Sequence, residues 1–486
     1  MSADARTFYL IAVGGTAMTP LASLLIERGH RVLGSDGPVY PPMSDRLAAM
    51  GIHVRPAFHE ENLTPDVDEV VVGNLARKDN PELLAALRRG LKVRSMPETL
   101  RDEFLLGRHP VVVAGTHGKT TTTALIAWLL AAAGREPGFL VGGEPLNFEG
   151  PSALGRGPAF VVEGDEYSTS YADKGPKFLH YAPETLVLTS IEFDHADLYD
   201  SLAAVKDAFR QVVALVPPHG RIVANGDDRN VLDVLQGARA RIILYGLRGG
   251  AAPAEERPET DLAAYDIQES AEGVAFGVAH AQRPLFAAMS PLSGRHNVAN
   301  ALAAIGAARV FDVTPAELAA GLASFRGVKR RLEVVGTAAG VTVLDDFAHH
   351  PTAVATTLAG AQKRYPGARL WAVFEPRSIT GGRAEFFPKY LEALRGAGGV
   401  ALAAPFHAAR LSGEGGPGAL DVHALAAELS AAGVPAFSAK DADSLVAELL
   451  PRLVRGDVVL AMSSGSFGGF HQKLLEGLRG REERET

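Results

Sequence analysis

Cysteine is absent from the 486-residue chain, so disulfide bonds, thiolate catalysis and cysteine-bound metals are excluded. An excess of positive charge is also absent: 48 Lys and Arg face 56 Asp and Glu, which gives a formal net charge of -8. Nonspecific nucleic-acid binding needs a dense cationic face, so we expect no nucleic-acid partner. A local basic pocket for phosphates stays open.

Long hydrophobic runs are missing as well. The apolar run at residues 8–13 is much shorter than the apolar core of a signal peptide with its cleavage site. The longest helical apolar stretch, residues 124–133, is well below the roughly 20 residues that span a bilayer. We therefore expect a cytoplasmic protein with no membrane partner.

Short strand-like runs alternate with Ala- and Leu-rich helical patterns almost throughout the chain. The length predicts two to four domains of roughly 100–200 residues. The alternation predicts an α/β protein with parallel sheets, helices on both faces and ligand sites beyond the carboxyl ends of the strands. We place three domains at residues 1–107, 108–326 and 327–486. Loops are expected at residues 134–158 and 248–260.

A glycine-rich turn with a lysine follows the apolar run at residues 111–113 and begins a helix. Glycines let successive backbone N–H groups point at phosphate oxygens, and the helix N-terminus adds about half a positive charge. The lysine can neutralise terminal phosphates and the next hydroxyl can bind Mg²⁺. The alternative is an ordinary strand–turn–helix junction. The predicted ATP-binding residues are Gly115, Thr116, His117, Gly118, Lys119, Thr120 and Thr121.

Acidic and imidazole side chains follow two further strand-like runs. Such ligands beside a phosphate loop can hold one or two hard cations against a triphosphate. Viewed alone, His195 is an ordinary loop histidine, but its place after a strand beside Asp194 favours a metal ligand. The group comprises Glu163, Asp165, Glu166, Glu192, Asp194, His195 and Asp197.

Together these segments resemble the Mur ligases, the ATP-dependent enzymes that build the peptidoglycan stem peptide. The hallmarks are a G-T-x-G-K-T loop at 115–120, an acidic residue at 163, E-x-D-H at 192–195 and R-H-N-x-x-N at 295–300. The C-terminal third adds KRRL at 329–332 and DDFAHHP at 345–351. The resemblance implies an N-terminal Rossmann-like UDP-binding domain, a central P-loop ATPase domain and a C-terminal domain of dinucleotide-binding type.

Further segments are similar to the branch of this family that joins UDP-N-acetylmuramate to a murein tripeptide during peptidoglycan recycling. They include SDGPVYPPMS at 35–44, FEPRS at 374–378 and SSGSFGGFHQKLL at 463–475. The resemblance implies ATP and Mg²⁺ as cofactors. It implies UDP-N-acetylmuramate and the murein tripeptide as small-molecule partners, and a monomer or weak homodimer. The alternative within the family is the branch that adds L-alanine to the same nucleotide sugar.

The resemblance also implies roles for individual residues. Lys119 is expected to stabilise the migrating phosphoryl group, Thr120 and Glu163 to bind one Mg²⁺, and His195 to bind a second. His117 either contacts the substrate carboxylate or shapes the turn. Arg210 stands where several Mur ligases have a carbamylated lysine, so we predict no carbamylation here.

Guanidinium groups suit a peptide that has several carboxylates. Arg377 is the leading candidate and Arg383 the second, because Arg377 follows the apolar strand-like run at residues 370–374. Asp346, His349 and His350 are expected to orient ATP or the amine, with general-base assistance left open. Asn297 and Asn300 fit adenine contacts or simple helix caps. Arg330 and Arg331 are expected to reach ATP phosphates.

The N-terminal turn matches the dinucleotide-binding fingerprint at its middle glycine alone. In the context of the family, Gly14, Gly15 and Thr16 still offer donors to a pyrophosphate, and Asp36 stands where a ribose or uracil is contacted. Val113 replaces the first glycine of the strict phosphate-loop pattern. Two other classes remain as alternatives, a nucleotide-dependent dehydrogenase and a noncatalytic ATP-binding scaffold.

Overall fold

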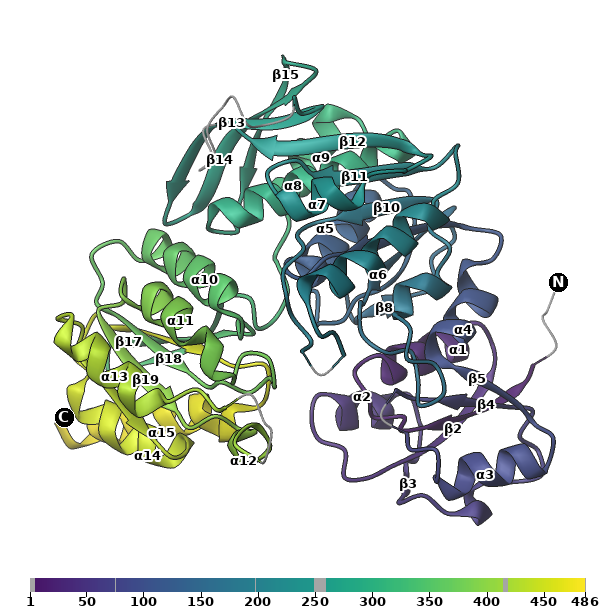
Figure 1. The fold of residues 1–486 in the computed structure, drawn as a ribbon, viewed down its shortest axis with the longest axis horizontal. Coiled ribbons are helices and arrows are strands. Elements are labelled where there is room, and N and C mark those ends of the chain that lie inside the picture. The colour runs from purple at the N-terminus through teal and green to yellow at the C-terminus, as the bar shows by residue number, and fades with distance from the viewer. Residues whose placement is uncertain (1–4, 75, 197, 249–258, 414–417, 486) are drawn as a thin grey trace.

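The computed structural model describes residues 5–74, 76–196, 198–248, 259–413 and 418–485, and its strands form three separate sheets (Figure 1). The predicted α/β fold with three domains is confirmed. The exact domain boundaries stay predictions. Among the helices that the structure describes, none is both long and apolar enough to span a membrane.

The N-terminal sheet has five parallel strands in the order β3-β2-β1-β4-β5. The strand order reverses between β1 and β4, and such a switch point places the ligand crevice at the turn after β1. The elements are β1 (Thr7–Ile11), α1 (Met18–Glu27), β2 (Arg31–Asp36), α2 (Met43–Ala49), β3 (Arg55–Pro56), β4 (Glu69–Val72), α3 (Pro81–Arg88), β5 (Lys92–Ser95) and α4 (Met96–Leu100).

The central sheet has ten strands in the order β15-β14-β13-β12-β11-β10-β6-β9-β7-β8. Strand β6 lies between β10 and β9, so the loops after these three strands meet at one edge. The strands are β6 (His109–Ala114), β7 (Gly138–Leu140), β8 (Ser152–Ala153), β9 (Ala159–Gly164), β10 (Thr185–Leu188), β11 (Arg221–Asn225), β12 (Arg241–Leu247), β13 (Leu262–Ser270), β14 (Gly273–His280) and β15 (Arg283–Ser290). The helices are α5 (Lys119–Ala132), α6 (Leu202–Leu215), α7 (Arg229–Val234), α8 (Arg295–Ala308) and α9 (Pro315–Ala323).

Two parts of the central domain differ from the sequence prediction. Strands β13, β14 and β15 pair antiparallel, whereas the pattern predicts parallel sheets. The predicted loop at 134–158 contains the short strands β7 and β8, because β7 extends the sheet beside β9. The second predicted loop, at 248–260, lies mostly outside the described residues.

The C-terminal sheet has six strands in the order β16-β17-β21-β18-β19-β20, and β16 alone is antiparallel to its neighbour. Its strands are β16 (Glu333–Ala338), β17 (Val341–Asp346), β18 (Leu370–Phe374), β19 (Gly399–Ala403), β20 (Ala436–Ala439) and β21 (Val458–Met462). Its helices are α10 (Pro351–Arg364), α11 (Phe387–Leu394), α12 (Ala408–Leu411), α13 (Val422–Ala431), α14 (Ala442–Leu449) and α15 (Phe470–Glu485).

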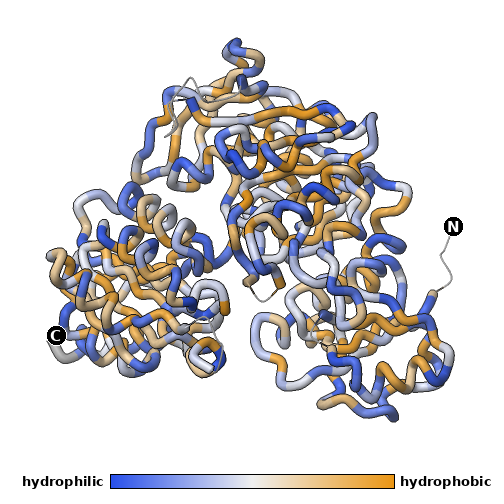
Figure 2. Tube along the Cα trace, viewed as in Figure 1, coloured by the Kyte–Doolittle hydropathy of each residue, from blue (hydrophilic) through white to orange (hydrophobic). Residues whose placement is uncertain are grey.

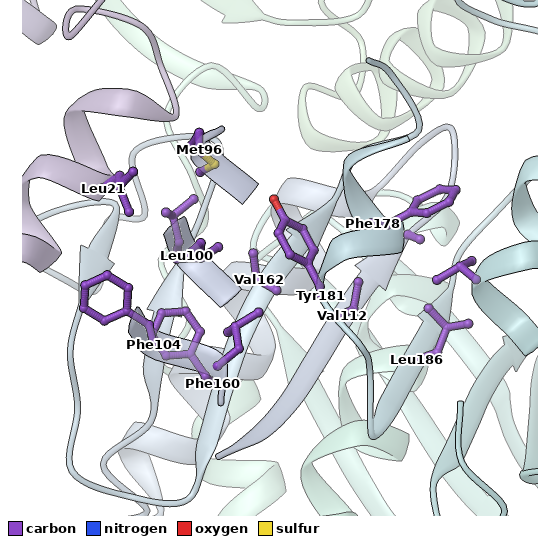
Figure 3. Packing of buried hydrophobic residues seen from close by; sticks show 14 of the residues in the cluster. Leu21, Met96, Leu100, Phe104, Val112, Phe160, Val162, Phe178, Tyr181 and Leu186 are labelled. Carbon is purple, nitrogen blue, oxygen red and sulfur yellow. The ribbon is translucent and has the colours of Figure 1, made fainter. Parts of the chain in front are cut away.

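The domains differ in how they contact one another. Figure 2 shows hydrophobic residues concentrated along the strands inside each domain. One apolar cluster continues from the N-terminal into the central domain, where Phe104 meets Phe160 with ring centroids 6.3 Å apart (Figure 3). In contrast, the apolar cluster around Leu344 and Phe374 in the C-terminal domain has almost no partner outside that domain. Among the described residues of the other two domains, Phe193 alone packs against it. We infer that the C-terminal domain is the one free to move, since little apolar surface holds it.

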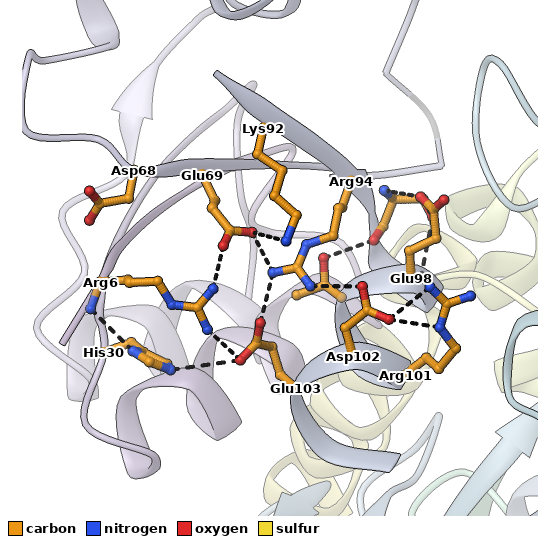
Figure 4. Close-up of polar contacts among 12 residues, drawn as sticks. Arg6, His30, Asp68, Glu69, Lys92, Arg94, Glu98, Arg101, Asp102 and Glu103 are labelled. Carbon is orange, nitrogen blue, oxygen red and sulfur yellow. Dashed lines mark hydrogen bonds and ion pairs between the residues drawn. The ribbon is translucent and has the colours of Figure 1, made fainter. Parts of the chain in front are cut away.

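A buried charge network supports the N-terminal domain beside α4 (Figure 4). The Arg94 guanidinium pairs with Glu69, with Glu103 at 2.8 Å and with Asp102 at 3.1 Å. The side chains of Arg94, Glu69 and Glu103 are only 7–8% exposed. Burial by itself raises the pKa of Glu103, but Arg94 and Arg6 outweigh burial, and the pKa is lowered overall.

We predict that Arg94→Met lowers the free energy of unfolding by up to about 3–5 kcal/mol, because the buried carboxylates of Glu69 and Glu103 lose their buried cation and keep only the more exposed Arg6 and Lys92 as ion-pair partners. The loss should be full at pH 7 and shrink below pH about 4.5, as the pH falls through the lowered pKa of Glu103 and its carboxylate is neutralised. Urea unfolding of the wild type and the variant, at pH 7 and below pH about 4.5, measures the loss of stability. Arg77→Met is the control, since the Arg77–Asp79 pair is exposed to solvent and should contribute little to stability. Equal losses in the two variants would contradict the prediction.

Candidate active site

The phosphate loop connects β6 to α5 and depends on two glycines. Gly115 and Gly118 have φ angles of +139° and +81°, which favour glycine. A Cβ atom on Gly115 would lie 2.1 Å from the Thr189 hydroxyl, and one on Gly118 would lie 2.5 Å from the Asn300 amide oxygen. Val113 stays inside β6, paired with Glu163 of β9, so the missing first glycine leaves the strand regular. The loop therefore presents the free N–H groups of the first turn of α5 to a ligand.

Lys119 is held inside this loop. Its ammonium donates to the Gly115 carbonyl at 2.6 Å and pairs with Glu166 at 2.9 Å. Burial lowers the pKa of this lysine, but the carboxylates of Glu166, Asp165 and Glu163 outweigh burial and raise it. The lysine is therefore charged and positioned where a phosphate above the loop would replace one of its partners.

Glu163 and Thr120 form the adjacent cation-binding corner. The Thr120 hydroxyl donates to one Glu163 oxygen at 3.3 Å, and the Gly142 amide donates to the other at 2.7 Å. Burial and the neighbouring Asp165 raise the pKa of Glu163 to about 7. Negative charge is therefore in excess at this buried corner, and the available ligands are a hydroxyl and carboxylate oxygens. Both features fit a hard cation such as Mg²⁺.

Glu166 is one of the grouped acids for which no individual role was predicted, and it connects the phosphate loop to His195. Besides Lys119, it contacts the imidazole of His195, with Nε2 and Oε1 3.3 Å apart. Burial would raise the pKa of Glu166, but Lys119 and His195 lower it to about 2. Burial lowers the pKa of His195, but Glu166 and Asp194 raise it more strongly, so the pKa is above the ordinary value. Glu166 thus joins the predicted phosphate and metal residues into one ionic network.

Arg210, at the position of the family's carbamylated lysine, and the nearby Lys206 have partners of their own. Arg210 and Lys206 on α6 both pair with Asp233 on α7, at 2.9 and 3.0 Å. Their side chains are therefore committed to a helix–helix contact, while Glu166 lies beside the imidazole. Asp197, which the sequence analysis grouped with these acids, lies outside the described residues.

Helix α8 brings two predicted adenine contacts under the phosphate loop. The Asn300 amide donates to Asn297 at 3.2 Å, and Asn297 donates to the Ser293 carbonyl at 2.8 Å. Neither side chain caps the helix, since the cap residue is Gly294 and no side-chain cap bond forms there. Asn300 instead packs against Gly118, so it supports the loop.

In the N-terminal turn after β1, two of the backbone amides that could bind a ligand already donate hydrogen bonds within the protein. The Asp36 carboxylate accepts from the amides of Gly14 at 2.8 Å and Gly37 at 2.7 Å, and the Gly15 amide donates to the Ala12 carbonyl at 3.2 Å. These two glycine amides are engaged inside the turn, and Thr16 is the one of the three predicted residues that lines the cavity described below. Pyrophosphate binding by Gly14, Gly15 and Thr16, and a ribose or uracil contact from Asp36, stay predictions.

The two arginines at the start of the C-terminal domain, Arg330 and Arg331, differ in the partners of their side chains. Arg330 bonds to Asp345 at 3.0 Å and to the carbonyls of Ser463 and Gly465 at 2.8 and 2.7 Å. Its charge is thus used inside the C-terminal domain. Arg331 lines the cavity, where its charge helps to lower the pKa of buried His296 to about 4 after the larger effect of burial. Contact with ATP phosphates stays a prediction for both arginines, and Arg331 is the one of the two that lines the cavity.

Asp346 and His350 sit at the carboxyl end of β17. Asp346 accepts from the amides of Leu332 and Ala348, both at 2.8 Å, and burial raises its pKa. The carboxylate therefore shapes the loop that precedes α10. Burial and His117 lower the pKa of His350 to about 4, so its imidazole is neutral at neutral pH.

Arg377 lies at the end of β18, apart from the phosphate loop. Its guanidinium stacks 3.9 Å from the ring centroid of the exposed Phe406 and is 3.5 Å from Glu375. It also presses on Gly465, where a Cβ atom would be 2.0 Å from Nε. Arg383, the second candidate for a carboxylate, is occupied by Glu385 at 3.3 Å.

A cavity of about 930 Å³ connects the three domains. Each domain contributes lining residues, from Thr16 through the phosphate loop to Arg331. The predicted site residues in its lining are Thr16, Thr116, His117, Gly118, Lys119, Thr120, Thr121, Glu163, Asp165, Glu192, Asp194, His195, Asn297, Asn300, Arg331, Asp346 and His349. The predicted and described residues outside its lining are Gly14, Gly15, Asp36, Gly115, Glu166, Arg330, His350, Arg377 and Arg383.

This arrangement can bind a polyphosphate and neutralise it. Backbone amides and Lys119 provide positive charge at one wall, and the acidic corner at Glu163 can hold the accompanying cation. A second substrate can reach the same space from the N-terminal turn. The chemistry that fits is phosphoryl transfer to an acid held between the domains.

Three family models match the chain in order along its length. They are the Mur ligase family catalytic domain at residues 7–105, the Mur ligase middle domain at 113–308 and the Mur ligase glutamate ligase domain at 330–465.

Individual relatives match the chain over nearly its whole length. The chain is 39% identical to the UDP-N-acetylmuramate–L-alanyl-gamma-D-glutamyl-meso-2,6-diaminoheptandioate ligase of Escherichia coli K12, over 98% of this chain and 99% of that one. It is 33% identical to the UDP-N-acetylmuramate–L-alanine ligase of Paraburkholderia xenovorans, over 97% and 98%. A crystal structure of a murein peptide ligase from Psychrobacter arcticus 273-4 superimposes with a TM-score of 0.72, at 32% identity and over 98% and 99% of the two chains.

Proposed function

The chain belongs to the Mur ligase family, and from this premise we propose that it joins UDP-N-acetylmuramate to the tripeptide L-Ala-γ-D-Glu-meso-diaminopimelate at the expense of ATP. The observation that carries the choice of substrates is the similarity to the Escherichia coli ligase along 98% of the chain, because the name of that enzyme states both substrates. We place the reaction in peptidoglycan recycling. The proposal keeps the cytoplasmic location expected from the sequence and a monomer or weak homodimer.

The chemistry overcomes the low reactivity of a carboxylate. A lactyl carboxylate oxygen attacks the γ-phosphorus of ATP, the bond to the β-phosphate oxygen breaks, and ADP leaves. The resulting acyl phosphate is attacked at its carbonyl carbon by the peptide amine. A C–N bond forms, inorganic phosphate leaves, and the amine loses a proton. This route requires positioning and charge neutralisation more than a protein nucleophile.

The residues of the phosphate loop perform the first step. Lys119 stabilises the charge on the migrating phosphoryl group, and the amides at the start of α5 bind the phosphates. Thr120 and Glu163 would hold Mg²⁺, and His195 beside Glu166 would hold a second ion. When bound, these cations would draw negative charge away from the triphosphate and the substrate carboxylate.

The C-terminal domain supplies the acceptor. We infer that Arg377 binds a peptide carboxylate, because its side chain is 27% exposed and its guanidinium is stacked on Phe406 beyond a strand end. It lies outside the cavity in this structure, so the domain must move to deliver the peptide. The contacts across this boundary are mostly polar, as between Thr352 and Glu192 at 2.8 Å and between Thr380 and the Ala196 amide at 2.9 Å, and such contacts can re-form when the domain moves. Closure also keeps water from the acyl phosphate.

The acceptor assay tests this function directly. Purified protein is mixed with ATP, Mg²⁺ and UDP-N-acetylmuramate, and phosphate release is followed with the tripeptide or with L-alanine. We expect kcat/KM to be at least about 100-fold higher for the tripeptide, with one ADP formed for each amide bond. A preference for L-alanine would assign the chain to the other branch. Phosphate release that needs neither acceptor would contradict ligation.

A further inference from the structure

Two histidines and a glutamate converge between segments of the central and C-terminal domains. His117 belongs to the loop, Glu192 follows β10, and His350 directly precedes α10. Their ligand atoms all lie within 4.8 Å of one another. The Glu192 oxygen Oε2 is 3.6 Å from Nε2 of His117 and 3.4 Å from Nδ1 of His350.

These spacings match the first coordination sphere of a small divalent ion. With metal–ligand distances near 2.0–2.1 Å, tetrahedral geometry separates the ligand atoms by about 3.3 Å. Both carboxylate–imidazole distances are within a few tenths of an ångström of that spacing. The two imidazole nitrogens lie within 4.8 Å of each other, and rotation about the side-chain bonds of the two histidines can shorten that separation.

The two imidazole nitrogens have no other use in the part of the chain that the structure describes. Nε2 of His117 and Nδ1 of His350 are buried and make no hydrogen bond. His350 is 2% exposed, so water does not compensate for the unused nitrogen. A buried polar atom without a partner is costly, and a metal ion would satisfy both nitrogens at once.

The donor set also selects the kind of ion. Two imidazoles and one carboxylate suit Zn²⁺ and its first-row neighbours, whereas Mg²⁺ prefers oxygen ligands. The Thr352 hydroxyl donates to Glu192 Oε2 at 2.8 Å and so orients the carboxylate from outside, as second-sphere groups do in metal sites. The set shares no residue with the proposed magnesium ligands Thr120, Glu163 and His195.

We propose that His117, Glu192 and His350 form a transition-metal site that binds Zn²⁺ and ties the phosphate loop to the start of α10. Because two of its ligands come from the central domain and one from the C-terminal domain, the ion holds these domains in the arrangement seen here. It therefore slows their separation and acts on the reaction from outside the magnesium site.

The test uses the full-length protein with Co²⁺, whose visible absorption reports tetrahedral coordination, in the presence of millimolar Mg²⁺. We expect one Co²⁺ per chain with a tetrahedral spectrum, displaced by an equivalent of Zn²⁺. His350→Gln and Glu192→Gln should each weaken Zn²⁺ binding by more than about tenfold, since even outer-sphere changes cost about 10–100-fold. Two separate variants are used, and their melting temperatures without metal confirm that each is folded.

Matched controls identify the site. His349→Gln changes the adjacent histidine, which faces Asp194 at 3.8 Å, and should leave the Co²⁺ spectrum intact. His195→Gln removes a proposed magnesium ligand and should also leave it intact. Loss of the spectrum in either control with retention in His350→Gln would place the ion elsewhere and overturn the proposal. Absence of any tetrahedral spectrum in the folded wild-type protein would overturn it too.

Discussion

Replacing Lys119 with methionine should lower kcat by about 1,000-fold or more, as removal of an electrostatic group that acts on a transferring phosphoryl does elsewhere. Methionine retains most of the stem and removes the ammonium, which lies 2.6 Å from the Gly115 carbonyl at the base of the loop. The measurement is ADP formation at saturating ATP, UDP-N-acetylmuramate and tripeptide. A variant that keeps more than a tenth of the wild-type kcat would reject the assigned role.

A second variant separates chemistry from stability. Lys119→Met alone leaves Glu166, whose side chain is 3% exposed, with His195 as its remaining ion-pair partner. We expect a lower melting temperature from this buried, poorly compensated charge. Adding Glu166→Gln removes the charge and should restore much of the melting temperature while turnover stays low. Recovery of turnover in the double variant would attribute the loss to misfolding of the loop.

Exchanging Arg331 for alanine should lower kcat/KM for ATP by about 10–100-fold, which corresponds to about 1.4–2.7 kcal/mol of transition-state stabilisation. Arg331 lines the cavity and adds positive charge opposite the acidic corner, where it lowers the pKa of Glu163 in competition with burial. Initial rates at varied ATP, with the other substrates saturating, measure the effect.

The neighbouring arginine provides the control for this prediction. Arg330→Ala removes hydrogen bonds to Asp345, Ser463 and Gly465, so it should lower the melting temperature. Its effect on kcat/KM for ATP should stay below about fivefold. If Arg330→Ala impaired ATP use more than Arg331→Ala did, the distinction drawn from the structure would be wrong.

Most of the fold could be predicted because strand and helix patterns are local. The apolar runs that become β1, β6, β17, β18 and β21 are buried strands bounded by turns. The antiparallel strands β13–β15 could not be predicted in this way. The hairpin between β14 and β15 places Ala281 and Gln282 at φ angles of +46° and +65°, without the Asn-Gly signal that usually marks such a turn. Pairing between the strands imposes that conformation.

In the candidate site, too, the local features could be predicted and the contacts between distant segments could not. The phosphate loop could be predicted because its glycines, lysine and threonines are consecutive and act through one turn. The role of Glu166 could not, since it depends on β6 lying beside both β9 and β10, which brings Lys119 and His195 to the same carboxylate.

By itself, the sequence determined the alternation of strands and helices, the nucleotide loop and the motifs that indicate the family, because each of these consists of residues close together in the chain. The tertiary structure decided which side chains are still free to act. It committed Arg330, Asp346 and Asp36 to internal hydrogen bonds, left Arg331 facing the cavity, and brought His117, Glu192 and His350 together from three segments. The physical reason is that a charged or polar group must find a partner when it is buried, and packing between distant segments determines which partners are available.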